Sequence, residues 1–393
     1  MIRALEIVLS LIIVFLIAVV VAVFLPSSGH IERVVELSNP VRQIFDTVDG
    51  FARYPEHSAL RTFDPAVKFT RSGPANGAGA KVAWQTDYDK IGDGGLTVTE
   101  SAEDSQVKMA VVNDWMGTNK RYTMDLIPAS NGKTVRVKMS YDVDYGWNLI
   151  WRFAGLYING VPDSTLQTTL ANLSGMMGGF PNVDYADLAI RVVDVTSKPI
   201  LFVSTKAPRS LEEVDAASDA AKVEIEAIME KAGLVAAGPP MTITTNWGDE
   251  SYTFDYAIPV DKASFTLDGI ELTINAVDPD VVRAAVIEDE EPVVDPVPAV
   301  VGEKDKKGHL VLGGNVRATQ SYAGKALYAE YTGSPAALPL LRLKERAYAE
   351  THGYRYTESG QGRFFDESLS AVEDIYAGVG EYRVYLPIIM TSP

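Results

Sequence analysis

The chain has 393 residues, of which 35 are Lys or Arg and 52 are Asp or Glu, giving a formal net charge of −17. This acidic balance argues against nucleic acid as a partner, because binding the phosphate backbone requires a basic surface. The sequence contains no cysteine, which excludes disulfides, thiolate nucleophiles and Cys-ligated zinc or iron–sulfur sites.

The first 29 residues differ in composition from the rest of the chain. Residues 7–25 carry no charge, and Ser10 is their only polar side chain. A helix of this length spans roughly 28 Å, close to the hydrocarbon thickness of a bilayer. We therefore predict a transmembrane anchor over residues 1–29 that contacts the lipid bilayer through residues 7–25. The alternative is a cleaved signal peptide, although the apolar run is longer than usual for one.

The charges beside the anchor bear on its orientation. Arg3 and Glu6 precede the apolar run, and Glu32 and Arg33 follow it. The positive-inside tendency favours an amino terminus in the cytoplasm. We expect a single-pass protein of the inner membrane whose soluble domains face the periplasm or the exterior.

Residues 30–180 predict one α+β domain. A strand pattern at 31–38 is followed by a helix at 41–54, which Pro40 opens. Turn-rich segments then separate short strand patterns, an order typical of an antiparallel sheet. The strand patterns lie at 68–71, 80–88, 95–101, 106–112, 121–128 and 133–143, and helical patterns follow at 148–158 and 164–177. A sheet that closes over a long helix leaves a cavity between them.

Four segments of this domain resemble a known family. SGPANGAGAKVAWQ, IGDGGLTVTES and the helical stretches WRFAGLYI and TLANL are similar to the START-like polyketide cyclase/dehydrase (SRPBCC) group, which has a helix-grip fold. The resemblance covers roughly residues 31–177. It implies a hydrophobic ligand cavity, and it implies no particular reaction, because most members bind rather than catalyse.

Residues 185–390 contain two similar halves, each with the order strand, helix, strand, strand. In the first half these patterns lie at 188–208, 211–233, 238–247 and 252–260; in the second they lie at 315–333 and 338–354, with an irregular stretch before the last strand at 375–388. Each half ends in a short apolar strand closed by a proline, Pro259 or Pro387. Internal duplication explains this symmetry.

The segments KPILFVSTKAP, EAIMEKAGLVAAGPPMTI, FDYAIPV and YRVYLPI resemble the gyrase-inhibitor-like (GyrI-like, AraC-type) effector-binding domain. Many members carry an acid two residues before an aromatic in the last strand, where it meets a cationic ligand. Here Arg383 has that position, and Glu381 lies two residues earlier on the same strand face as Arg383 and Tyr385. Two alternatives are open: Glu381 and Arg383 form a pair that is neutral overall, or Arg383 binds an anionic ligand.

The insertion at 288–307 carries seven acids, three lysines and prolines 292, 296 and 298. These prolines discourage helix and sheet, so we predict a solvated loop. A calcium site is disfavoured because the acids lack the spacing of an EF-hand loop.

Motifs of metal, phosphate or nucleophilic catalysis are missing. The four histidines are not at metal-ligand spacing, and the sequence has neither a Gly-x-Ser-x-Gly elbow nor a phosphate-binding Gly-Lys loop. We therefore expect no metal and no cofactor. A DNA-binding regulator is also disfavoured, because we find no helix-turn-helix pattern.

Aromatic and charged residues are the candidate ligand-binding groups, since Tyr and Trp combine apolar area with a polar atom. The competing interpretation for each is core packing or a solvated ion pair. In the first domain the candidates are Trp84, Tyr88, Glu100, Trp115, Trp151 and Arg152; in the second they are Trp247, Tyr256, Tyr328, Glu381, Arg383 and Tyr385.

These features predict a membrane-anchored protein that binds an apolar or amphipathic small molecule in two cavity domains. Whether it is an enzyme is left open by the residues. As a hydrolase or cyclase it would use Glu381 as general base for water together with Tyr385. A third alternative is an interaction scaffold in an envelope complex.

Overall fold

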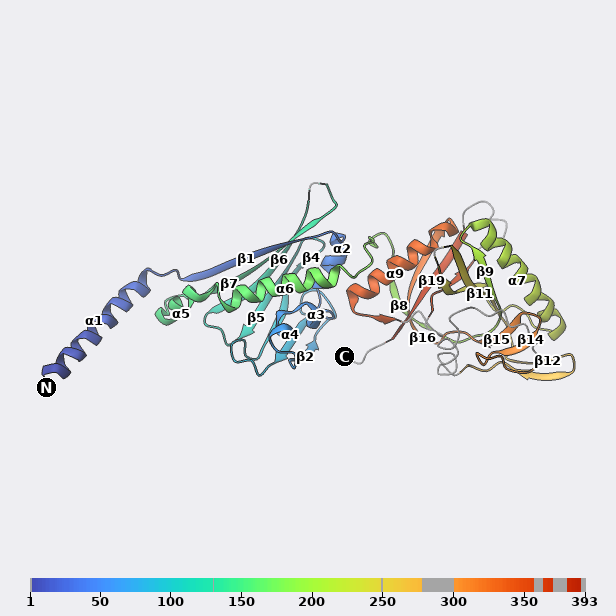
Figure 1. Ribbon diagram of the computed structural model, residues 1–393, viewed down its shortest axis with the longest axis horizontal. Coiled ribbons are helices and arrows are strands. Elements are labelled where there is room, and N and C mark those ends of the chain that lie inside the picture. Colours follow the sequence, from blue (N-terminus) through green and yellow to red (C-terminus); the bar gives the residue numbers. More distant parts are fainter. Residues whose placement is uncertain are drawn as a thin grey trace. The chain divides into compact units, whose positions relative to one another are not determined.

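The computed structural model describes residues 2–129, 131–248, 250–277, 300–356, 363–369 and 380–389, with side chains from Glu6 onward. Within it the chain forms two compact units, mainly Met1–Asp184 and mainly Tyr185–Ala349 with Tyr354–Ser392 (Figure 1). Most of the acidic segment predicted as a loop at 288–307 lies outside the described residues. The predicted class, an α+β fold with antiparallel sheets behind an apolar helix, is confirmed.

Helix α1 (Ile2–Phe24) contains the apolar run. Glu6–Phe24 has a mean hydropathy of 3.5 and is almost entirely exposed. Its length and composition are sufficient for one membrane crossing. Pro26 follows directly after the helix, as expected for a residue that cannot continue it.

The first unit contains a seven-stranded antiparallel sheet in the order β1-β7-β6-β5-β4-β3-β2. The strands are β1 (Ser28–Leu37), β2 (Lys68–Ser72), β3 (Lys81–Gln85), β4 (Gly94–Ala102), β5 (Gln106–Asn113), β6 (Thr118–Pro128) and β7 (Val135–Asp144). The helices are α2 (Val41–Val48), α3 (Tyr54–His57), α4 (Ala59–Phe63), α5 (Leu149–Ala154), the 3-10 turn η1 (Gly155–Tyr157) and α6 (Val161–Met177).

The long helix α6 packs against β1 and β7, which is the expected helix-grip arrangement. Leu166, Leu170 and Leu173 recur on one face of α6 and are fully or almost fully buried. The helix predicted over 41–54 is shorter than expected, because α2 ends at Val48 and Gly50 instead pairs with Asn76 in an isolated bridge. A side chain at Gly50 would lie 2.6 Å from the backbone oxygen of Ala75, so only glycine allows this approach.

The described residues of the second unit form a ten-stranded antiparallel sheet whose centre is symmetric. Its continuous order is β14-β15-β9-β11-β10-β18-β19-β16-β8, and β17 adds to β19. The strands are β8 (Arg191–Val195), β9 (Pro199–Pro208), β10 (Met241–Trp247), β11 (Ser251–Pro259), β14 (Leu310–Gly313), β15 (Val316–Gln320), β16 (Gly324–Gly333), β17 (Arg355–Tyr356), β18 (Phe365–Ser368) and β19 (Gly380–Ile389). A separate hairpin joins β12 (Ser264–Leu267) to β13 (Ile270–Thr273).

Two halves of this sheet meet where β10 pairs with β18. One half is β9, helix α7 (Leu211–Ala232), β10 and β11; the other is β16, helix α9 (Leu338–His352), β18 and β19. The short 3-10 turn η2 (Pro335–Ala337) precedes α9. Helix α7 begins at a Ser210 cap and ends at Gly233, whose φ of 63° suits glycine.

The outer strands are exchanged between the halves. Strand β8 precedes β9 in the chain but pairs with β16, whereas β15 precedes β16 but pairs with β9. The strand patterns predicted over 188–208 and 315–333 therefore each contain two strands rather than one. The periodicity of an apolar run does not reveal such a break, because both strands alternate in the same way.

Candidate functional site

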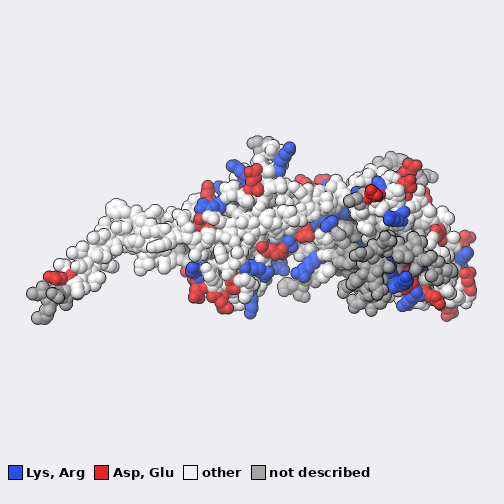
Figure 2. All heavy atoms as spheres, viewed as in Figure 1, with Lys and Arg blue, Asp and Glu red and all other residues white. Residues whose placement is uncertain are grey.

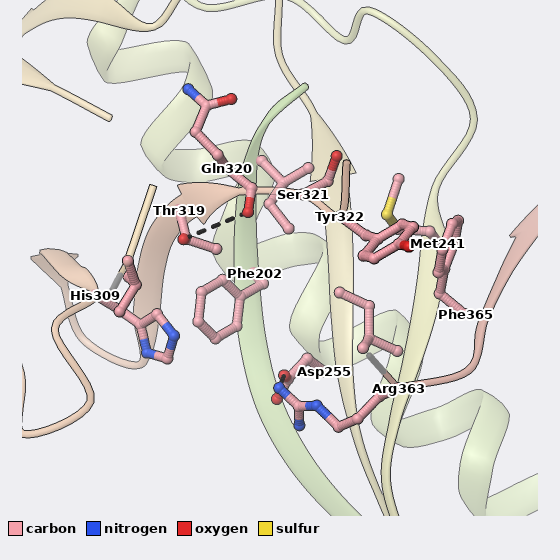
Figure 3. Close-up of a pocket in the computed structure, with 13 residues that line it drawn as sticks. Phe202, Met241, Asp255, His309, Thr319, Gln320, Ser321, Tyr322, Arg363 and Phe365 are labelled. Carbon is pink, nitrogen blue, oxygen red and sulfur yellow. Dashed lines mark hydrogen bonds and ion pairs between the residues drawn. The ribbon is translucent and has the colours of Figure 1, made fainter. Parts of the chain in front are cut away.

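A pocket of about 60 Å³ lies on the sheet of the second unit (Figure 3). Strand alternation explains its position. Leu201 and Val203 of β9 belong to the core cluster that contains the buried residues of α7, whereas Ile200 and Phe202 belong to a different cluster. The pocket therefore lies on the face of β9 opposite α7.

The pocket has an apolar floor and a polar rim. The floor is formed by Ile200, Phe202, Met241, Ile243 and Phe365, and the rim includes Asp255, His309, Thr319, Gln320, Ser321 and Arg363. At the rim, Arg363 lies 3.6 Å from Asp255, which also accepts a 2.6 Å hydrogen bond from Ser204. Such a combination of apolar surface and few polar groups is typical of small-molecule sites.

His309 forms one wall of the pocket. Its ring packs edge-on against Phe202, with 4.9 Å between the ring centroids. Its Nδ1 atom lies 3.2 Å from Asp305. Burial opposes ionisation of Asp305, but the contacts with His309 and the backbone hydrogen bond from Lys307 together outweigh it, and the pKa of Asp305 is lower than usual. Asp305 therefore fixes the orientation of the His309 ring.

A buried carboxylate adjoins the pocket through Phe365. Glu367 lies two residues further along β18, is 6% exposed, and accepts a 3.1 Å hydrogen bond from the Tyr385 hydroxyl. The ring of Tyr385 stacks on Phe365 at 4.5 Å. Burial and the charge of Glu367 raise the pKa of Tyr385, so this hydroxyl stays protonated at neutral pH.

Two cations face Glu367. Arg383 lies 3.5 Å and Lys198 lies 3.7 Å from its carboxyl oxygens, and both cationic side chains are about 40% exposed. One carboxylate with two cations carries a net positive charge. We call Lys198, Glu367, Arg383 and Tyr385 the Glu367 cluster.

The structure brings together three of the six predicted residues of this unit. The ring of Tyr328 lies 5.0 Å from that of Tyr385, and Arg383 belongs to the Glu367 cluster. Glu381 is exposed at the start of β19. Because it lies four residues from Tyr385 on one strand, the two are roughly 13 Å apart, and the structure does not bring them together.

Trp247 and Tyr256 lie elsewhere in the second unit. Trp247, at the end of β10, packs on Tyr252 and on the guanidinium of Arg209. Tyr256 packs against the core cluster beneath α7. Neither of them lines the pocket.

Glu367 itself was missed by sequence reasoning. It lies in a strand of only four residues, FDES, within a stretch that reads as irregular. Its partners come from β9 and β19, far away in the chain. The only local signal is the alternation of Phe365 and Glu367, which is too short to identify a strand.

The first unit has a much smaller cavity, of about 20 Å³. This space has room for roughly one water molecule. Tyr54, His57 and Tyr122 are among the residues that line it, but none of the six predicted residues does. The side chains around this cavity therefore leave little room in it for a ligand.

The six predicted residues of the first unit have structural contacts. Trp84 is buried and donates to the Gly92 carbonyl at 3.0 Å, Trp115 donates to Lys90, and Tyr88 stacks on Phe63. Trp151 packs on the core, and Glu100 pairs with Lys108 at the surface.

Arg152 is buried and binds the end of α1. Its Nη1 atom donates to the carbonyls of Val23 at 2.9 Å and Leu25 at 3.3 Å, and its Nε atom donates to Gly146 at 2.8 Å. The last carbonyls of a helix have no partner within the helix. Arg152 therefore caps α1 and does not face a cavity.

A second buried polar cluster lies beneath α9. Arg342 donates to Asp366, and a 3.4 Å contact joins it to the Tyr252 hydroxyl. Glu345 is fully buried, and neither of its carboxyl oxygens has a hydrogen-bond partner in the part of the chain that the structure describes. Burial and the nearby Asp366 raise the pKa of Glu345 well above its usual value, although Arg342 opposes this.

Replacing Glu345 is expected to change how stability depends on pH. A carboxyl whose pKa is raised by folding stabilises the fold at low pH, and this contribution is lost as pH rises. Glu345→Gln should therefore be about 1 to 2 kcal/mol more stable than the parent at pH 8 and equally stable near pH 4. Urea unfolding at both pH values measures this. The exposed Glu226→Gln on α7 is the matched control, and an equal gain at both pH values would contradict the titration of Glu345.

Within the described residues, no group of three or more His, Asp or Glu side chains has an arrangement that could hold a metal ion.

No protein-family model matches the sequence, and no curated protein matches it. Several solved structures are distantly similar. A norcoclaurine synthase point mutant from Thalictrum flavum, in complex with a transition-state analogue, is 11% identical with a TM-score of 0.32, over 38% of this chain and 94% of its own. XoxI from Bacillus cereus is 12% identical with a TM-score of 0.30, over 38% and 96%. The EcmrR–DNA complex is 10% identical with a TM-score of 0.35, over 62% and 72%.

Proposed function

We propose that this chain is a membrane-anchored binding protein whose second unit takes a small amphipathic molecule. The pocket lined by Phe202, Met241 and Phe365, whose Phe365 ring stacks on Tyr385 of the Glu367 cluster, is the observation that carries the proposal. Helix α1 is proposed as the anchor. The duplicated sheet supports a relationship to the gyrase-inhibitor-like effector-binding domains.

The charges favour a ligand with an apolar ring and an anionic group. The ring would lie on Phe202 and Phe365, because aromatic pairs gain from stacking beyond the area they bury. At the rim, Asp255 already pairs with Arg363. The net positive charge of the Glu367 cluster is therefore the part that selects the ligand, with Arg383 as its most suitable group for a planar anion.

A substitution that fills the pocket should weaken binding. Benzenesulfonate is a suitable probe, and ligand-observed NMR on the full chain in nanodiscs measures its affinity. Ile243→Trp is expected to weaken binding by about tenfold or more, a loss of roughly 1.4 kcal/mol. Val192→Trp, in β8 and outside the pocket, is the matched control.

The preference of the site for an anion is tested with probes that share a benzene ring and differ in charge. Benzenesulfonate should bind more tightly than benzyl alcohol, and benzylammonium should bind most weakly. Arg383→Gln should reduce the difference between the anion and the alcohol. Equal affinities for all three probes, or binding unaffected by Ile243→Trp, would contradict this function.

Two alternatives are weaker. Ligand binding by the START-like first unit would require its core side chains to move, because the present cavity is about 20 Å³. A hydrolase would more readily use Glu367 than Glu381 beside Tyr385, given the 3.1 Å hydrogen bond between them. Turnover that survives Glu367→Gln would exclude this carboxylate as the base.

We also propose that the amino terminus is cytoplasmic and that both units face the periplasm or exterior, with no nucleic acid as partner. A reporter that works only after export should be active when it is fused after Pro393. Activity of a reporter that works only in the cytoplasm would reverse this orientation.

A further inference from the structure

The segment between β7 and α6 is unusual for a soluble surface. Residues 145–162 contain a single charged side chain, Arg152. Four large side chains of this segment are 58–81% exposed: Trp147, Ile150, Leu156 and Tyr157. We call these four residues the interfacial patch. A solvated surface seldom gathers so many large apolar side chains in one short segment.

Arg152 fixes this patch beside the end of α1. The guanidinium that donates to Val23 and Leu25 belongs to α5, and α5 also packs against α1. The ring of Trp147 lies 4.9 Å from the same guanidinium. Uncharged surface continues from α1 onto the adjoining end of the first unit, where α5 lies (Figure 2). The patch is thus level with the last turn of α1.

We infer that the interfacial patch inserts into the headgroup region of the bilayer, on the side where α1 leaves it. This inference rests on the membrane span proposed for α1. The last turn of a spanning helix lies at the interface, and Trp and Tyr are the side chains most enriched there. The one charge in the segment is satisfied by helix carbonyls, so inserting the patch requires no unpaired charge to enter the lipid.

The second contact has a consequence for the first unit. A single helix would leave the unit free to tilt about residues 25–28. A patch held beside the helix end adds a second attachment point, so the first unit would keep one edge of its sheet at the membrane surface.

The absence of cysteine allows this to be tested on the full chain. Single variants Ile150→Cys and Tyr157→Cys carry a spin label, with Val112→Cys on β5 (70% exposed) as the aqueous control and Val14→Cys in α1 as the control for the span. The labelled proteins are reconstituted in vesicles of phosphatidylcholine and phosphatidylglycerol. Collision with oxygen reports lipid exposure, and collision with a nickel chelate reports water exposure.

Insertion predicts that the labels at Ile150 and Tyr157 collide several-fold less with nickel, and more with oxygen, than the label at Val112. If these two labels collide with nickel as often as the label at Val112 does, while the label at Val14 lies in lipid, the inference that the patch inserts is wrong and the membrane span of α1 still stands. Protection from both reagents would also overturn it, because it would indicate contact with protein. A label at Val14 that is open to nickel would refute the span itself.

Discussion

Arg342→Leu is expected to destabilise the second unit by about 3 to 5 kcal/mol, the range for removing one partner of a buried ion pair. Arg342 and Asp366 are 8% and 3% exposed, and Glu345 beside them is fully buried. Arg342 is the cation that opposes the raised pKa values of both carboxyls. Its loss leaves two buried acids without a positive charge.

Urea unfolding of the detergent-solubilised full chain, with hydrogen-exchange mass spectrometry as the readout, measures this loss of stability for each unit separately. The double variant Arg342→Leu/Asp366→Leu should recover much of it, because the unpaired acid is also removed. The exposed pair of Lys325 and Asp194, 2.8 Å apart, is the matched control. Lys325→Leu should change stability by about 0.5 kcal/mol or less. A loss that small for Arg342→Leu would show that Asp366 is solvated or has another partner.

Replacing His57 is expected to make the free energy of unfolding of the first unit depend less on pH under acidic conditions. His57 is 3% exposed, and neither ring nitrogen has a hydrogen-bond partner among the described residues. Burial and the charge of Arg53 lower the pKa of His57 to about 4. Below pH 6.5 the unfolded chain binds a proton that the folded unit does not, so stability falls by about 3 kcal/mol between pH 6.5 and 4.

Both His57→Leu and His57→Gln should remove this part of the pH dependence, since neither side chain titrates. Comparing an apolar with a polar replacement distinguishes the effect of losing a titrating group from the effect of changing how the side chain packs. The second unit, read in the same hydrogen-exchange experiment, should keep its profile. If both variants retain the parental slope between pH 6.5 and 4, the ring is protonated in the folded unit.

The elements that were predicted are those with a long, regular pattern. Leu166, Leu170 and Leu173 recur at helical spacing, and α6 forms where they indicate it. The strands of the first unit follow one another as hairpins, so local turns define them. Glycine is needed at Gly94 for packing, because a side chain there would lie 2.5 Å from the Trp84 ring.

The candidate site was predicted less well because long-range pairing creates it. Arg383 and Tyr385 were identified from the resemblance of the last strand and Tyr328 as an aromatic candidate, and β16 and β19 bring them together. Glu367 reaches them only because β18 pairs with both β10 and β19. A sequence pattern specifies which face a residue occupies, whereas it does not specify which strands are neighbours.

The exchanged outer strands make the two halves of the second unit depend on each other during synthesis. When the first half leaves the ribosome, β8 has no partner and β9 has an open edge, because β16 and β15 come later in the chain. Unpaired edges of this kind invite association with other chains. Closing the sheet requires contacts between residues far apart in sequence, which are slow to form. We therefore expect the second unit to fold as a whole after its second half is made, and we expect neither half to be stable as a separate fragment.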